Sequence, residues 1–136
     1  MKSRIAMLSA ACLFLMIGAG LAHAELEQTM VANVPFDFYA GNQEMPAGTY
    51  EVRFDPASDL ILVSDRSKQH EGFLMGTRES DGASDVSELV FDHTGSEYYL
   101  KDMKSYNVEL SFRVKRSESS AALKNRSTQV EVAMNR

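Results

Sequence analysis

The residue types that most often bind metal are scarce in this chain of 136 residues. Beyond an apolar N-terminal segment it contains only two histidines, His70 and His93, and its single cysteine, Cys12, lies within that segment. A zinc site needs three or four converging His, Cys or carboxylate ligands. We therefore predict neither a metal site nor a cofactor. Carboxylates such as Asp65, Glu71 and Asp92 could add ligands, but residues of this type are too common in an acidic chain to indicate a site.

Sequence motifs for nucleophilic catalysis are also missing. No serine stands in a Gly-x-Ser-x-Gly or Ser-x-x-Lys arrangement, and the segment Gly72–Gly76 lacks the Lys-Ser/Thr pair of a phosphate-binding loop. Pairs drawn from the 19 acidic residues could still meet across a cleft, as in glycoside hydrolysis. We expect a protein without catalytic residues, and a small hydrolase that uses loop carboxylates is the alternative.

Charge is divided unevenly along the chain. Residues 25–100 hold 4 basic and 15 acidic side chains, whereas residues 101–136 hold 8 basic and 4 acidic ones. The acidic balance argues against a nucleic-acid partner. The basic segment, about 113–136, either lies against its own acidic body or contacts anionic envelope components such as lipid head groups or acidic polysaccharide. The predicted anion-contacting residues are Arg113, Lys115, Arg116, Lys124 and Arg126.

Two adjacent tyrosines, Tyr98 and Tyr99, stand out in a chain without tryptophan. Neighbouring residues of a strand face opposite sides of a sheet. An outward tyrosine could stack on a sugar, but a sheet that is covered on both faces explains the pair more simply.

The N-terminus has the pattern of a signal peptide. Lys2 and Arg4 precede the apolar run Ile5–Leu21, which ends in Ala-His-Ala before Glu25. We expect cleavage after Ala24, export to the periplasm or the extracellular space, and no transmembrane anchor afterwards. Cleavage would change the net charge from −5 to −7 and remove the only cysteine.

Residues 25–136 read as one β-rich domain. Apolar and polar residues alternate in short segments separated by turn residues, which is typical of strands. We predict an all-β fold, either an antiparallel β-sandwich or a small barrel of seven or eight strands, in which Ser117 caps one short helix near the C-terminus. Pro35 suggests that the first strand lies at an edge or carries a bulge. The predicted strands are 31–38, 49–54, 60–63, 73–77, 87–93, 97–103, 108–114 and 129–134.

Several blocks resemble a group of short, exported bacterial proteins of the acidobacterial type. The first block comprises Asn33–Phe38 and Met45–Val52, a "VPFDF" string followed by "PAGTY". The second comprises Glu88–His93 and Tyr98–Leu100, and the charged segment Arg113–Lys124 is similar to the tail of the group. The resemblance implies export and a β-rich fold, and it brings no catalytic residues with it.

These observations together predict a non-catalytic, exported binding protein or a structural module of the cell envelope. Its partner would be an envelope component or a polysaccharide. A further alternative is a self-assembling subunit that pairs through an edge strand near Pro35 or at Val130–Met134, so homo-oligomerisation stays open.

Overall fold

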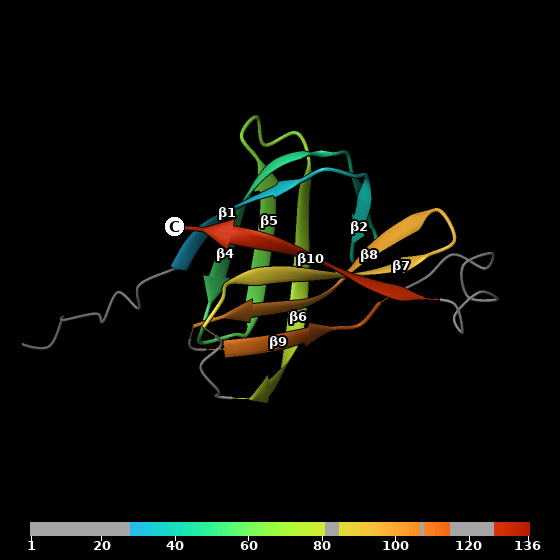
Figure 1. The fold of residues 1–136 in the computed structure, drawn as a ribbon. Coiled ribbons are helices and arrows are strands. Elements are labelled where there is room, and N and C mark those ends of the chain that lie inside the picture. Colours follow the sequence, from blue (N-terminus) through green and yellow to red (C-terminus); the bar gives the residue numbers. More distant parts are fainter. Residues whose placement is uncertain (1–27, 81–84, 107, 115–126) are drawn as a thin grey trace, which may run out of the picture.

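The computed structural model describes residues 28–80, 85–106, 108–114 and 127–136, and in these residues the chain forms ten strands and no helix (Figure 1). The strands are β1 (Gln28–Val34), β2 (Phe38–Ala40), β3 (Gln43–Met45), β4 (Gly48–Asp55), β5 (Leu60–Asp65), β6 (Glu71–Ser80), β7 (Glu88–Thr94), β8 (Glu97–Ser105), β9 (Val108–Phe112) and β10 (Thr128–Asn135).

Eight of these strands close into an antiparallel barrel. The order around it is β8-β7-β10-β1-β4-β5-β6-β9, and pairing between β9 and β8 completes the ring. The two short strands lie outside the ring: β2 pairs in parallel with β8, and β3 pairs with β2. The all-β prediction is confirmed, and of the two architectures that we expected, the chain adopts the small barrel.

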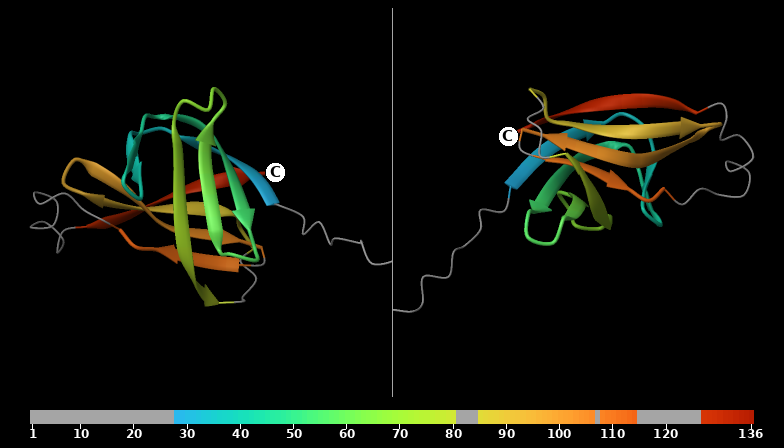
Figure 2. Two further views of the ribbon diagram at one scale, coloured as in Figure 1. Left: turned by 180° about the vertical axis from the view of Figure 1, so that it is seen from behind. Right: turned by 90° about the horizontal axis from the view of Figure 1, so that it is seen from below.

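The barrel consists of two three-stranded meanders joined by the terminal strands. Strands β4–β6 form one meander and β7–β9 the other, and β1 and β10 lie between them on one side. The strands of the two meanders cross one another when the molecule is seen from the front or from behind (Figures 1 and 2). This crossing brings the apolar faces of both meanders onto one core.

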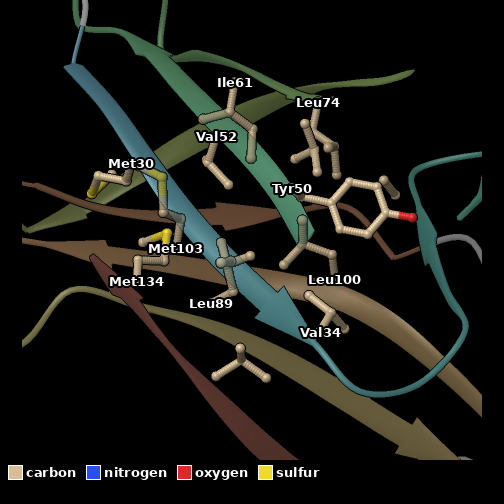
Figure 3. Packing of buried hydrophobic residues seen from close by; sticks show 14 of the residues in the cluster. Met30, Val34, Tyr50, Val52, Ile61, Leu74, Leu89, Leu100, Met103 and Met134 are labelled. Atoms are coloured by element: carbon tan, nitrogen blue, oxygen red, sulfur yellow. The ribbon is translucent and has the colours of Figure 1, made fainter. Parts of the chain in front are cut away.

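The core follows from alternation along the strands. In β4 the side chains of Tyr50, Val52 and Phe54 are buried while their neighbours are partly or fully exposed. An eight-stranded barrel is just wide enough for side chains to fill its interior. The buried side chains from both meanders do so here, and Figure 3 shows those of β1, β4 and β7 pointing towards one another.

The β2–β3 hairpin was not expected, because the sequence predicts a loop between the strands 31–38 and 49–54. Phe38 anchors the hairpin: its ring packs edge-on against Tyr50 at a centroid distance of 5.3 Å and against Phe91 at 5.2 Å. Gly41, with a φ of 64°, makes the two-residue turn. Strands of only three residues show no recognisable alternation of apolar and polar residues, so their formation depends on this tertiary packing.

Other strand boundaries differ from the prediction. Strand β1 starts at Gln28, three residues before the predicted strand 31–38, and ends at Val34 before Pro35. Strand β6 is ten residues long, twice the predicted length. Neither β1 nor β10 lies at the end of the sheet order, although they pair with each other at only two positions, 31↔135 and 32↔134.

Several expectations fall outside the described residues. These are the signal peptide 1–24 with cleavage after Ala24, the short helix after Ser117, and the basic residues Lys115, Arg116, Lys124 and Arg126. Within the described residues, no helix is long and apolar enough to cross a membrane.

Candidate functional site

A groove lies at the side of the barrel where β6 and β9 separate. Its volume is about 360 Å³, and we call it the arginine groove. It is lined by Gly41, Asn42, Phe73, Leu74, Met75, Phe112, Arg113 and Val114. Ligand sites are commonly concave and mostly apolar, with a few polar groups. This lining has that character, because among the described residues Asn42 and Arg113 are the only polar side chains that line it.

The groove exists because β9 covers only half of β6. The β6–β9 register starts at Gly76↔Phe112 and continues towards Ser80, so in the described residues β9 does not pair with the first half of β6. In that half, Phe73 and Met75 are 62% and 74% exposed. Side chains of this size are rarely left in water beside one another without a role in contact.

The exposed side chains continue an apolar surface onto the next strand. Phe73 is the register partner of Leu62, and Met75 is the partner of Leu60, and both leucines of β5 are only half-buried. Residues directly opposite on neighbouring strands pack side by side. The outer surface of β5 and β6 therefore carries four adjacent apolar side chains next to the groove.

Arg113 is the one predicted anion-contacting residue that the structure describes. It is exposed, follows directly after β9, and forms no ion pair with any described residue. The charge division along the sequence thus located one polar residue of the groove, whereas Phe73 and Met75 were missed as site residues. Their signal was present: in a strand, three consecutive apolar residues, 73–75, must place at least one on the outer face.

A second groove, which we call the acidic groove, has a volume of about 370 Å³ and lies on the other side of the β2–β3 hairpin. It is lined by Asp37, Gln43, Glu44, Pro46 and His70. The Asp37 Oδ1 atom accepts a hydrogen bond of 2.7 Å from the Ala47 N–H, so this carboxylate also fixes the turn before β4.

Hydrogen bonds to Asp65 organise the β5–β6 turn beside the acidic groove. The Asp65 carboxylate contacts His70 Nδ1 at 3.0 Å and accepts hydrogen bonds from the Ser67 hydroxyl at 2.8 Å and from the Gln69 N–H at 3.0 Å. These hydrogen bonds, the one with His70 first, lower the pKa of Asp65 to about 2.

The Asp65 turn does not form a catalytic triad. In a triad the histidine lies between the nucleophile and the acid. Here Ser67 and His70 both contact the same oxygen of Asp65, and that oxygen is an acceptor for each of them. Within the described ranges no three His, Cys, Asp or Glu side chains gather closely enough to hold a metal ion.

The remaining histidine and the tyrosine pair serve packing. Tyr98 stacks between His93, at a centroid distance of 4.2 Å, and Phe36, at 3.9 Å. On the other side of β8, Tyr99 is buried and stacks on Tyr39 of β2 at 5.2 Å. Both faces of this strand are covered, as the simpler of the two interpretations of the tyrosine pair requires.

The negative charge around the acidic groove also acts on tyrosines. Burial, and then the nearby charges of Asp65 and Asp37, raise the pKa of Tyr50 to about 12. Glu44 is the main cause of the raised pKa of Tyr39. The two grooves thus differ in potential as well as in lining.

Comparison with known proteins adds no relative: no family model, no curated protein and no solved structure matches the chain.

Proposed function

We propose that this protein is a non-catalytic binding module of the cell envelope and that it holds an anionic component in the arginine groove. The observation that carries the proposal is the position of Arg113 beside the exposed Phe73 and Met75. The barrel interior supports it indirectly, because it is filled by side chains and binding must then use the outer surface.

The proposal includes export through the N-terminal segment. Its apolar run and its Ala-His-Ala ending support cleavage after Ala24. Protein recovered from the envelope fraction or the medium of expressing cells should therefore begin at Glu25 in mass spectrometry. Recovery of the uncleaved chain from the cytoplasm alone would contradict export.

Retention on envelope materials tests the binding function. The exported protein is incubated at low salt with peptidoglycan, an acidic polysaccharide and vesicles containing anionic lipid. We expect retention on at least one of them, and a loss of retention in Arg113→Gln. The control is Arg66→Gln, which removes the same charge from the exposed β5–β6 turn. Absence of retention on all three materials would refute the proposal.

A second candidate function, hydrolysis, is favoured by one observation: Asp37 and Glu44 line the same groove. Two carboxylates across a cleft are the minimum for glycoside cleavage. Chromogenic glycosides test it. Turnover that disappears in Glu44→Gln and persists in Glu71→Gln would establish this function in place of the first, and absence of turnover would remove it.

A further inference from the structure

The lining of the arginine groove restricts the chemistry of its ligand. The apolar lining residues belong to β6, to the end of β9 and to Val114, and Arg113 lies among them. Of these, Phe73 and Met75 are the most exposed. A sugar would bring several hydroxyl groups against this surface, and each buried hydroxyl without a partner is unfavourable. A hydrocarbon chain has no such requirement and gains from contact with Phe73 and Met75.

Arg113 restricts the polar end of the ligand. None of the described residues that line this groove carries a carboxylate, although the chain as a whole has a net charge of −5. A guanidinium group pairs well with one planar carboxylate through two parallel hydrogen bonds. A phosphate monoester would leave one of its two charges uncompensated near an acidic protein, so a single guanidinium group is better matched in charge by a carboxylate.

The size of the groove restricts the ligand further. A volume of about 360 Å³ is at the lower end of the range for small-molecule sites. A stable contact with a folded partner needs roughly 800 Å² on each side, far more than the four adjacent apolar side chains of β5 and β6 can supply. One unbranched chain is the occupant that matches these dimensions.

We propose that the arginine groove binds a single-chain fatty carboxylate, with the hydrocarbon chain over Phe73 and Met75 and the carboxylate on Arg113. This inference rests on the proposed binding function and names the ligand class for the same groove. The open side of the groove leaves one face of the chain in water, so the affinity depends on chain length and on the single ion pair.

Calorimetric titration with hexanoate, octanoate and decanoate, below their micelle concentrations, tests the apolar part. Each added methylene that is buried should tighten binding by up to about fourfold. The same affinity for all three chains would overturn the proposal. In the double variant Phe73→Ser/Met75→Ser the dependence on chain length should flatten, whereas Tyr106→Ser, which changes an exposed side chain outside the groove, should retain it.

Head-group specificity tests the role of Arg113. Decanoate should bind at least five- to tenfold more tightly than decanol, and Arg113→Gln should remove most of this difference. Arg66→Gln should leave it unchanged. Equal affinity for decanoate and decanol in the unaltered protein would overturn the proposal.

The binding position is followed on the Met75 methyl group by NMR with ¹³C-labelled methionine. Decanoate should shift the Met75 signal and leave the signals of the buried Met30 and Met103 nearly unchanged. Retention on acidic polysaccharide together with no effect of decanoate on Met75 would overturn the fatty-carboxylate assignment and leave the binding function standing. Failure of every anionic material would overturn both.

Discussion

The two grooves have nearly the same volume and share one wall, but their chemistry is opposite. The turn of the β2–β3 hairpin contributes Gly41 and Asn42 to the arginine groove, and the next two residues, Gln43 and Glu44, to the acidic groove. The difference comes from the opposite walls. One wall is the uncovered half of β6, and the other is the polar β5–β6 turn.

This comparison shows that a short hairpin can separate two environments on a small barrel. The hairpin is held by Phe38 in the core and by close contact between Ala40 and Gly72 of β6.

The largest effect is expected from Phe38→Ala. This substitution removes a fully buried ring that contacts Tyr50 and Phe91, and such losses cost about 3–5 kcal/mol of unfolding free energy. Urea denaturation followed by circular dichroism measures the loss. The matched control is Phe73→Ala, an exposed phenylalanine, with an expected cost below about 1 kcal/mol. Equal costs for both variants would show that the hairpin is not anchored through Phe38.

A smaller effect is expected from Gly72→Ala. A Cβ atom at this position would lie 2.7 Å from the Ala40 Cβ atom, so β2 would have to move away from β6. Overpacking of this kind costs about 1–3 kcal/mol. The control is Gly48→Ala, because a Cβ atom at position 48 would lie at an ordinary 3.7 Å from the nearest atom of the Tyr50 ring. Equal stability of Gly72→Ala and Gly48→Ala would show that β2 can move away from β6 at little cost in free energy.

The smallest effect concerns only the acidic side and depends on pH. The pKa of Asp65 is about 2 in the folded protein and close to 3.8 in an unfolded chain. The folded state therefore gains stability from this carboxylate above about pH 4, and the gain is lost as the pH falls towards 2. Melting temperatures of the unaltered protein and of Asp65→Asn should accordingly converge over this interval.

The cause of that pKa shift can be checked separately. NMR titration of the Asp65 carboxyl should show its pKa raised in His70→Gln, since the hydrogen bond with His70 is the largest contribution. Ser67→Ala should raise it less. A larger effect of Ser67→Ala would assign the main role to the hydroxyl.

Local patterns predicted the elements with strong alternation and missed those that depend on neighbours. The alternation of Tyr50, Val52 and Phe54 located β4. The predicted strands 87–93 and 97–103 match β7 and β8, which are joined by a turn in which Gly95 has a φ of 66°. Strands β2 and β3 have only three residues each, too few for a recognisable period, and they are stabilised by contacts with β8 and the core.

The residues of the candidate site could likewise be predicted only in part. The excess of basic residues after residue 100 pointed to Arg113, because charges can be counted along the sequence without knowledge of the fold. It could not identify Phe73 and Met75, because a strand of apolar residues is ordinarily covered. They lie on the outer face of β6, in the half that pairs with β5 but, within the described ranges, has no partner on the β9 side, because the β6–β9 register starts at Gly76.

The sequence by itself determined the all-β class and which residues share a face, because side chains alternate in every strand whatever its neighbours are. Only the tertiary structure decided that the sheet closes into a barrel. Closure depends on pairings between segments far apart in the chain, such as β1 with β10 and β6 with β9. The same long-range pairings decided which apolar side chains stay on the surface, and so where the arginine groove lies.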